Sequence, residues 1–404
     1  MRPKTIKVID QIIGQPICFF LTILRFITGG FLKRGKRSVK KVLFIKLIEQ
    51  GATVLAYSAI KKAVDMVGRD NVYFCVFEEN RPILDIMKII PEGNIIVIRQ
   101  DNIFIFLMDI IGLLIKSRSR GIDATIDMEF FSRASAILAY LSGAKVRVGL
   151  HRFKSELPYR GDLMTHRIQH NPYMHISKAY LQLVMALEAD STEVPMLKID
   201  EQELLVEAPR IEISEEQFAA AEKIIESIAG IAPSKPWVLL NANASDMLPL
   251  RKWATERFIE LGKRILEEYP TCTIMLTGAP SEQNSCEQIQ KEFDSSRIIS
   301  LAGHTTLKEL MVIYSMSDLL ITNDSGPGHF ASMTKVKTIV MFGPETPKLF
   351  GPLGDNTHVI WKNLVCSPCV NAFNHRFSPC TNNVCMQEIS VSEVYEKANS
   401  LLAG

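Results

Sequence analysis

Short apolar runs rich in β-branched residues alternate with helical stretches along most of this 404-residue chain, and this alternation limits the possible folds most strongly. Strand-like runs separated by helices of about 10–15 residues build parallel sheets through βαβ units. We therefore expect an α/β protein with two Rossmann-like, doubly wound parallel-sheet domains. The runs form two series, at residues 42–47, 71–77, 94–98, 123–128 and 145–150, and at 237–241, 273–278, 297–300, 318–322 and 338–343.

A polar, acidic stretch at residues 187–235 separates the two series, and Pro233 and Pro236 close it. We place the domain boundary there. The predicted segments are an N-terminal arm at 1–41, domains at 42–200 and 201–390, and a C-terminal helix at 391–404 that packs back on the domains. In open α/β sheets ligands bind at the carboxyl ends of the strands, so the chemistry is to be sought in the loops that follow the strands.

The N-terminal arm holds ten basic residues and one acidic residue, whereas the remainder of the chain holds 36 basic and 43 acidic residues. A mildly acidic body argues against binding of nucleic acid through bulk charge. The apolar stretch at 9–32 is interrupted by Gln15, Pro16 and Arg25, so it is too short to span a bilayer. We expect it to lie in the interface of an anionic membrane, with basic residues 33–41 at the headgroups. The alternative is a helix packed on the body.

A second apolar run, at residues 103–115, contains one charged residue, Asp109, and is followed by Lys116, Arg118 and Arg120. Its 13 residues cannot cross a bilayer. A buried core helix and a membrane-facing helix fit it equally well.

The sequence ITNDSGPGHFAS at residues 321–332 follows a predicted strand and opens a helix. Asp324 and Ser325 suit an N-cap, and Gly326 allows close approach to the backbone. The free N–H groups and the dipole of a helix N-terminus bind anions, phosphate above all, and His329 can reach the same anion. The alternative is an ordinary capped helix.

Two further loops of the second series carry polar groups at strand ends. In the loop at 341–354, Gly343 and the other Gly and Pro residues enforce a tight turn, and Glu345 and Thr346 are placed to bind ribose or sugar hydroxyls, unless the loop is only a structural turn. In the other loop, Lys252 precedes a helix and can neutralise a diphosphate, or it belongs to a surface charge pair.

The first strand–helix turn holds one carboxylate, Glu49, beside Gly51, which permits the turn, and Thr53, which can cap the helix. A carboxylate at a strand end can serve as a general base. The alternative is a solvated loop glutamate.

Four late cysteines have a spacing that resembles a zinc knuckle, so a structural zinc site is one interpretation. The other is a loop of reduced cysteines shaped by Pro368 and Pro379. The cysteines are Cys366, Cys369, Cys380 and Cys385.

Several of these motifs together resemble glycosyltransferase family nine, the lipopolysaccharide heptosyltransferases. The matching segments are VLFIKLIEQGATVL at 42–55, RKWATERF at 251–258, TNDSGPGHFASMTKVKTIVMFGPETP at 322–347, and the late CSPC…C…CMQEISVSEV, so the resemblance covers about residues 42–400.

The resemblance implies a GT-B fold and an inverting, metal-independent transfer of a sugar from a nucleotide-sugar donor, ADP-heptose or similar, to a lipid-linked saccharide. It implies no required cofactor, no nucleic-acid partner, and a peripheral, cytoplasmic location on the inner face of the bacterial inner membrane. The donor is expected at Asn241, Lys252, Asp324, Ser325, Gly326, His329, Gly343, Glu345 and Thr346, with Lys252 and His329 bearing the charge of the leaving group.

One position departs from the family pattern. The family usually has an aspartate as the base after the glycine of the first loop, and here Gly51 is followed by Ala52. Glu49 is then the first candidate for the base, with Asp127 and Glu129 next, on the acceptor side with Gly51 and Thr53. Two other functions stay open: a nucleotide-sugar epimerase or hydrolase on the same fold, and a catalytically inactive membrane scaffold.

Overall fold

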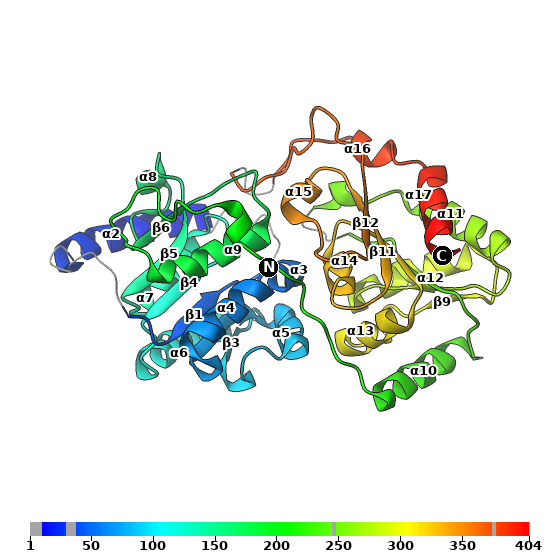
Figure 1. Cartoon of the computed structure of the whole chain (residues 1–404), viewed down its shortest axis with the longest axis horizontal. Helices are drawn as coiled ribbons and strands as arrows, with labels where there is room; N and C mark the ends of the chain where they lie inside the picture. Colours follow the sequence, from blue (N-terminus) through cyan, green and yellow to red (C-terminus); the bar gives the residue numbers. More distant parts are fainter. Residues whose placement is uncertain (1–9, 30–37, 231, 245–247, 374–376, 404) are drawn as a thin grey trace. The chain divides into compact units, whose positions relative to one another are not determined.

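The computed structural model describes residues 10–29, 38–230, 232–244, 248–373 and 377–403. The chain divides into two compact units, one up to Glu207 and the other from Ala208 (Figure 1). Each unit has its own parallel sheet and its own hydrophobic core.

The first unit is built on a six-stranded sheet in the order β3-β2-β1-β4-β5-β6, with every neighbouring pair parallel. The central strands are buried along their whole length, which suits their nearly continuous apolar sequences. The strands are β1 (Val42–Ile45), β2 (Val72–Phe77), β3 (Ile95–Ile98), β4 (Ala124–Asp127), β5 (Val146–His151) and β6 (His166–Gln169).

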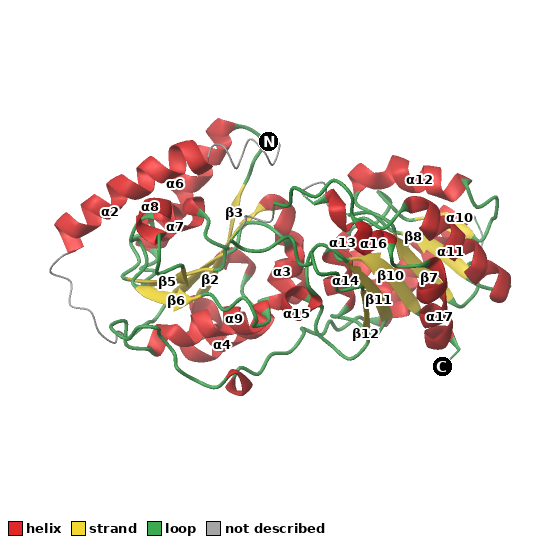
Figure 2. Cartoon of the chain, turned by 90° about the horizontal axis from the view of Figure 1, so that it is seen from above, coloured by secondary structure: helices red, strands yellow, loops and turns green. Residues whose placement is uncertain are grey.

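Helices cover both faces of this sheet. Figure 2 shows α2, α6 and α7 on one side of the sheet and α4 and α9 on the other. The helices are α2 (Gln15–Gly29), α3 (Gln50–Leu55), α4 (Tyr57–Val67), α5 (Arg81–Met87), α6 (Ile103–Ser119), α7 (Arg133–Leu141), α8 (Glu156–Arg160) and α9 (Ile176–Met185), with a π-helical turn at Asp10–Gly14.

The second unit repeats the same plan, with strand order β12-β11-β10-β7-β8-β9 and parallel pairing throughout. Its strands are β7 (Trp237–Asn241), β8 (Thr273–Leu276), β9 (Ile298–Ser300), β10 (Leu319–Asn323), β11 (Lys337–Phe342) and β12 (Thr357–Trp361). Its helices are α10 (Glu215–Ala229), α11 (Thr255–Glu268), α12 (Gln283–Lys291), α13 (Leu307–Met316), α14 (Gly326–Ala331), α15 (Pro347–Phe350), α16 (Val384–Gln387) and α17 (Val391–Leu402). The last of these, α17, packs on α11 and over β10 and β11.

All ten predicted strands are present, and each sheet has one strand more than the sequence predicts. The additional strands, β6 and β12, are the edge strands of their sheets and are only partly buried. Their sequences, HRIQ and THVIW, mix polar with apolar residues, because an edge strand has a solvent-exposed side. The prediction of two doubly wound parallel sheets is confirmed, with two strands missed.

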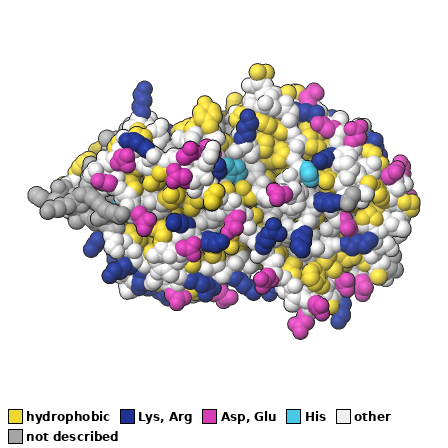
Figure 3. Space-filling view, in the orientation of Figure 1, with side chains coloured by type: hydrophobic (Ala, Val, Ile, Leu, Met, Phe, Trp, Pro, Cys, Tyr) yellow, Lys and Arg dark blue, Asp and Glu magenta, His cyan; other side chains and the backbone are white. Residues whose placement is uncertain are grey.

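None of the helices in the described part of the chain has both the length and the hydropathy that a membrane crossing requires. Of the basic cluster at 33–41, the structure describes Lys40 and Lys41, whereas residues 33–37 lie outside the described residues. Over the face seen in Figure 3, Lys and Arg side chains are interspersed with Asp and Glu side chains in both units.

Candidate functional site

Most of the predicted site residues follow the strands at which the strand order of each sheet reverses, and Gly343, Glu345 and Thr346 follow the neighbouring strand β11. In the first unit the reversal lies between β1 and β4, and in the second between β7 and β10. A reversal of strand order leaves a crevice at the carboxyl ends of the two strands, where α/β proteins bind their ligands. Glu49 follows β1 and Glu129 follows β4, while Lys252 follows β7 and Asp324 follows β10.

Glu129 holds the loop after β1 in place. Its carboxylate accepts hydrogen bonds from the backbone N–H groups of Leu47 at 2.7 Å and Ile48 at 3.3 Å. It also pairs with the buried Lys46 ammonium at 3.2 Å. Lys46 in turn lies 3.3 Å from the Glu49 carboxylate. Glu129 is therefore committed to structure, whereas Glu49, whose side chain is 18 % exposed, remains partly accessible.

Asp127, at the end of β4, is completely buried. Burial raises the pKa of its carboxyl to about 7, although the nearby Arg160 guanidinium, at 3.4 Å, acts against this rise. Asp127 also accepts a hydrogen bond from the backbone N–H of Glu129. Arg160 pairs with Glu156 as well, so Asp127 belongs to a closed network of buried charges.

The turn after β1 differs from its predicted form. The residue with left-handed backbone is Glu49, with φ 72°, and not Gly51. Gly51 and Thr53 are both buried inside α3, so Thr53 does not cap that helix. A non-glycine residue in this region of φ and ψ costs about 1–3 kcal/mol and is found most often at functional sites. The strain falls on the residue predicted to be the base.

In the second unit, two asparagines organise the strand ends. The Asn323 side-chain oxygen accepts from the Trp253 backbone N–H at 3.0 Å, and its amide donates to the Asn243 carbonyl at 3.0 Å. The Asn241 amide donates to the carbonyl of Thr277 at 2.9 Å. Both asparagines are buried, so Asn241 acts on the loop backbone rather than as an exposed ligand group.

Asp324 and Glu345 are buried and joined through Arg251. The Arg251 guanidinium lies 3.4 Å from Asp324 and also pairs with Glu345. Burial raises the pKa of both carboxyls, that of Glu345 to about 7. The cluster thus joins one guanidinium to two buried carboxyls of raised pKa, and it ties two strand-end loops together.

The sequence indicated Arg251 beside Lys252 as a cation before α11, but it did not predict the ion pairs of Arg251 with Asp324 and Glu345. Its two partners lie 73 and 94 positions further along the chain, so no local spacing marks the cluster. The neighbouring Lys252 is half-buried and forms no ion pair with any residue that the structure describes.

The helix α14 begins as predicted, with Ser325 at its N-cap and Pro in its first turn. The Ser325 hydroxyl donates to the Asn323 carbonyl at 3.2 Å and makes no bond to the helix N–H groups. Gly326 is the first helical residue, and His329 is a buried residue of the same helix. In the next loop, the Thr346 hydroxyl accepts from the Lys348 backbone N–H and caps α15.

Gly343 lies under the cysteine-rich segment. A side chain there would come within 2.4 Å of the Met386 sulfur and 3.0 Å of the Cys385 sulfur, so Met386 would have to move to admit it. Cys385 is buried, Cys369 is half-buried, and Cys366 and Cys380 are exposed. The described residues contain no group of three or more His, Cys, Asp or Glu side chains that could hold a metal ion, so the zinc interpretation gains no support.

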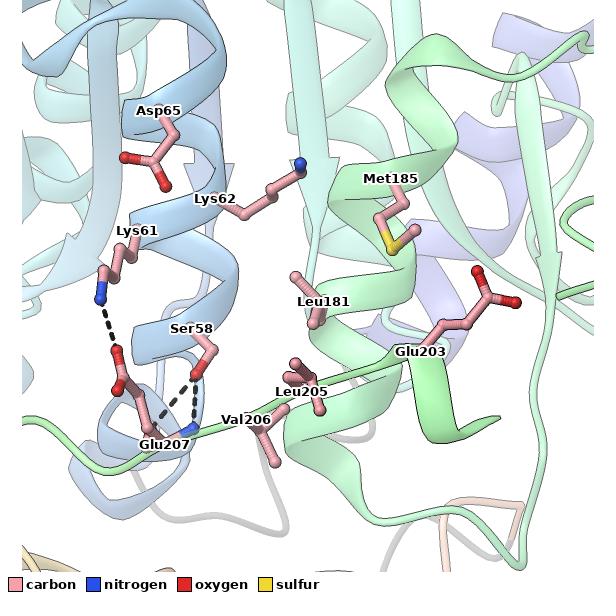
Figure 4. Close-up of a pocket in the computed structure, with 10 residues that line it drawn as sticks. All are labelled: Ser58, Lys61, Lys62, Asp65, Leu181, Met185, Glu203, Leu205, Val206 and Glu207. Carbon is pink, nitrogen blue, oxygen red and sulfur yellow. Dashed lines mark hydrogen bonds and ion pairs between the residues drawn. The ribbon is translucent and has the colours of Figure 1, made fainter. Parts of the chain in front are cut away.

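A cavity of about 430 Å³ in the first unit lies elsewhere, between α4, α9 and the segment that ends at Glu207. Figure 4 shows Lys61 and Ser58 directed at Glu207, with a 2.6 Å ion pair from Lys61 and a 2.8 Å hydrogen bond from the Glu207 backbone N–H to Ser58. None of the predicted site residues lines this cavity.

Comparison with known proteins places these features in a family. The family model described as glycosyltransferase family 9 (heptosyltransferase) matches residues 114–376. Lipooligosaccharide heptosyltransferase 2 of Campylobacter jejuni is 31 % identical over 157 residues, which are 38 % of this chain and 47 % of that protein. The chain thus spans about half the length of the curated relatives that it matches.

Solved structures resemble nearly the whole chain. The E. coli ADP-heptose LPS heptosyltransferase II matches with a TM-score of 0.65 at 18 % identity, covering 90 % of this chain and 98 % of that one. A family 9 glycosyltransferase from Veillonella parvula matches with a TM-score of 0.67 at 18 % identity, covering 91 % and 99 %. These similarities confirm the expected GT-B fold, with two Rossmann-like sheets.

Proposed function

The chain belongs to glycosyltransferase family 9, and on that premise we propose that it transfers a sugar from a nucleotide-sugar donor, ADP-heptose or similar, to a lipid-linked saccharide. The transfer is a step in the synthesis of bacterial lipopolysaccharide or a related surface polysaccharide. The observation that carries the proposal is the position of the polar loops that follow the strands in each of the two sheets. In each sheet the polar residues gather at the reversal of strand order, where this class of fold binds ligands.

The second unit holds the donor in this proposal. The diphosphate lies against the first N–H groups of α14, from Ser325 and Gly326 onward, with His329 in the same helix. Lys252 is the cation for the leaving group, because it is not committed to a partner among the described residues. The Arg251 cluster supports this arrangement by tying the loops after β10 and β11 together.

The first unit holds the acceptor and the base. Glu49 takes the proton from the acceptor hydroxyl while that oxygen attacks the anomeric carbon from the side opposite the diphosphate, so the anomeric configuration inverts. Asp127 and Glu129 are occupied by Arg160 and by the backbone of the β1 loop, which supports Glu49 over both. The developing charge on the leaving diphosphate is met by preorganised protein groups, so we expect transfer to continue in EDTA.

A thermal-shift screen of ADP-, GDP-, UDP- and CMP-sugars tests the donor site. A ligand that binds only the native state raises its stability by mass action, so the preferred nucleotide will give the largest shift. Lys252→Ala is the matched variant and should lose most of that shift. Binding should then be followed by transfer of the sugar to a lipid-linked saccharide panel. Release of free sugar without any acceptor would instead indicate a hydrolase or epimerase.

The lipid-linked acceptor places the enzyme at the inner face of the inner membrane in this proposal. The basic residues near the N-terminus and at the end of α6 support this location, because they attract anionic headgroups.

A further inference from the structure

Two polar side chains in the middle of α2, Thr22 and Arg25, face the domain, while Gln15 and Thr28 near its ends are exposed. The Thr22 hydroxyl accepts from the Asp162 backbone N–H at 3.0 Å, and the Arg25 guanidinium pairs with the Asp162 carboxylate at 2.6 Å. In the turn before the helix, Asp10 pairs with Arg133 at 2.8 Å. A helix on the surface of a water-soluble domain turns its polar side chains outward, so the middle of α2 has the opposite arrangement.

The outward side of α2 is correspondingly apolar. Phe20 is 68 % exposed and Ile27 is 71 % exposed. The large apolar side chains that α2 leaves exposed are Ile17, Phe19, Phe20, Ile23, Leu24, Phe26 and Ile27. Such a contiguous apolar surface is unfavourable in water and marks a site of interaction.

The helix α6 presents a second surface of the same kind. Its inner side packs into the core through Leu113, and its one carboxylate, Asp109, is bound by Arg99 at 2.8 Å. The exposed apolar side chains of α6 are Ile103, Phe104, Leu107, Met108, Ile111 and Ile115. The pairing of Asp109 removes an uncompensated negative charge from this helix.

The two helices belong to one layer. Both α2 and α6 contact α7, and all three lie on the same side of the first sheet (Figure 2). Cys18 of α2 and Leu113 of α6 enter the same hydrophobic core. The exposed sides of α2 and α6 therefore lie on the outer side of a single helical layer, and we call them together the α2–α6 face.

We propose that the α2–α6 face docks on the surface of a bilayer that contains anionic lipid. Basic side chains stand at the C-terminal end of α6, where Lys41 also donates to the Arg120 carbonyl at 2.8 Å. They are Lys40, Lys41, Lys116, Arg118 and Arg120. Apolar groups flanked by such a cluster match the acyl boundary and the anionic headgroups of a membrane. A symmetric contact with a second copy through the same face would instead bring two such basic clusters into one interface.

The inference deepens the proposed function, since it names the surface through which the enzyme would reach a lipid-linked acceptor. Docking and sugar transfer are nevertheless separable in the test. Vesicle binding requires no nucleotide, and donor binding requires no lipid. A protein that fails to bind any nucleotide sugar would sink the transferase proposal and leave the vesicle result intact.

Co-sedimentation with vesicles of phosphatidylethanolamine and phosphatidylglycerol tests the proposal on the full chain. Phe20→Glu on α2 and Phe104→Glu on α6 should each lower the partition coefficient about tenfold or more, the effect of one large apolar side chain on a transfer equilibrium. Both residues are exposed, so thermal stability should stay unchanged. Leu205→Glu is the matched control, because Leu205 is 82 % exposed and lies in the cavity beside α4 and α9.

Weaker binding of both variants, normal binding of the control, and lower binding to neutral phosphatidylcholine vesicles support the proposal. Full binding of Phe104→Glu overturns the part played by α6, and full binding of Phe20→Glu overturns that of α2. Sedimentation analysis of the same proteins without lipid tests the other possible occupant of this face, a second copy of the chain. If Phe20→Glu converts a dimer to a monomer and leaves vesicle binding unchanged, the face is an interface between copies and the proposal is wrong.

Discussion

Glu49 differs from the other two carboxylates at the reversal of strand order in the first sheet. Glu129 is bound to two backbone N–H groups and to Lys46, and Asp127 is fully buried beside Arg160. Glu49 is partly exposed and adopts a left-handed backbone with φ 72°. A carboxylate that must take a proton from a substrate needs access to it, so geometry favours Glu49.

We expect Glu49→Gln to lower kcat about 10²–10⁴-fold, the usual contribution of a general base. Glu49→Gly should show the same loss, because it removes the carboxylate while it relaxes the strained backbone. Donor binding by thermal shift should be normal in both variants. Glu78→Gln, which changes an exposed carboxylate after β2, serves as the control. Normal turnover of Glu49→Gln with its acceptor would show that the base lies elsewhere.

The buried pair of Asp324 and Glu345 gives donor binding a dependence on pH. Burial raises the pKa of Glu345 to about 7, so the Arg251 cluster carries less negative charge at pH 6 than at pH 8. As pH rises through about 7 the cluster gains a negative charge beside the proposed diphosphate site. A nucleotide-sugar diphosphate does not itself titrate in this range. Donor affinity should therefore fall between pH 6 and pH 8.

Titration calorimetry of the preferred nucleotide sugar at several pH values measures this effect. Glu345→Gln keeps a donor for Asp324 and an acceptor for Arg251, and it cannot ionise. Its donor affinity should be the same at pH 6 and pH 8. The same raised pKa means that Glu345 stabilises the folded state most at low pH and that this contribution is lost as pH rises through about 7. An equal loss of affinity in wild type and Glu345→Gln would assign the effect to another group.

At the scale of elements, the sequence predicts strands well where they are buried on both faces. Central parallel strands such as β1 and β10 are continuous apolar runs, and this signal needs no knowledge of the tertiary structure. The edge strands β6 and β12 have mixed sequences and were missed. The apolar character of α2 and α6 was also visible, but which side of each helix faces outward depends on partners such as Asp162 and Arg99.

The candidate site could be predicted in part for the same reason. Strand-end loops follow from the strands, so Glu49, Lys252 and Asp324 were found where the topology puts them. The partners that fix them come from distant segments, as Arg251 does for Glu345. Cysteine spacing predicted a metal site, yet spacing does not determine whether four sulfurs converge.

Gly161 determines how closely α2 approaches the first unit. A side chain at this position would come within 2.2 Å of the Thr22 hydroxyl oxygen and 2.7 Å of the Cys18 carbonyl oxygen. Gly161→Ala should therefore push α2 away, cost about 1–3 kcal/mol, and speed amide hydrogen exchange in α2. Gly121→Ala is the control, because Gly121 has φ +65°, close to the +72° of Gly161, with no atom near the added carbon. Equal exchange in α2 for both variants would show that only backbone strain matters.

At the scale of the whole molecule, the two units have separate cores. The first core lies on one face of the first sheet and includes Cys18, Ile45 and Leu113, and the second includes Phe258, Ile321 and Val394. Each sheet consists of strands from its own unit: β1 to β6 belong to the first unit and β7 to β12 to the second. A chain of this kind is expected to unfold in more than one step.

The three tryptophans allow the two steps to be separated, because Trp237, Trp253 and Trp361 all lie in the second unit. Tryptophan fluorescence then reports unfolding of the second unit, whereas far-UV circular dichroism reports unfolding of both units.

A nucleotide sugar at about 100 times its Kd stabilises the state that binds it by about 2.7 kcal/mol. If the second unit holds the donor, the ligand should raise the fluorescence midpoint and leave the other transition in the dichroism curve where it was. Lys252→Ala should abolish the fluorescence shift without moving either midpoint of the free protein. If the ligand instead raises only the dichroism midpoint that fluorescence does not report, the donor binds to the first unit. The assignment of the donor to the second unit and of the acceptor to the first would then be reversed.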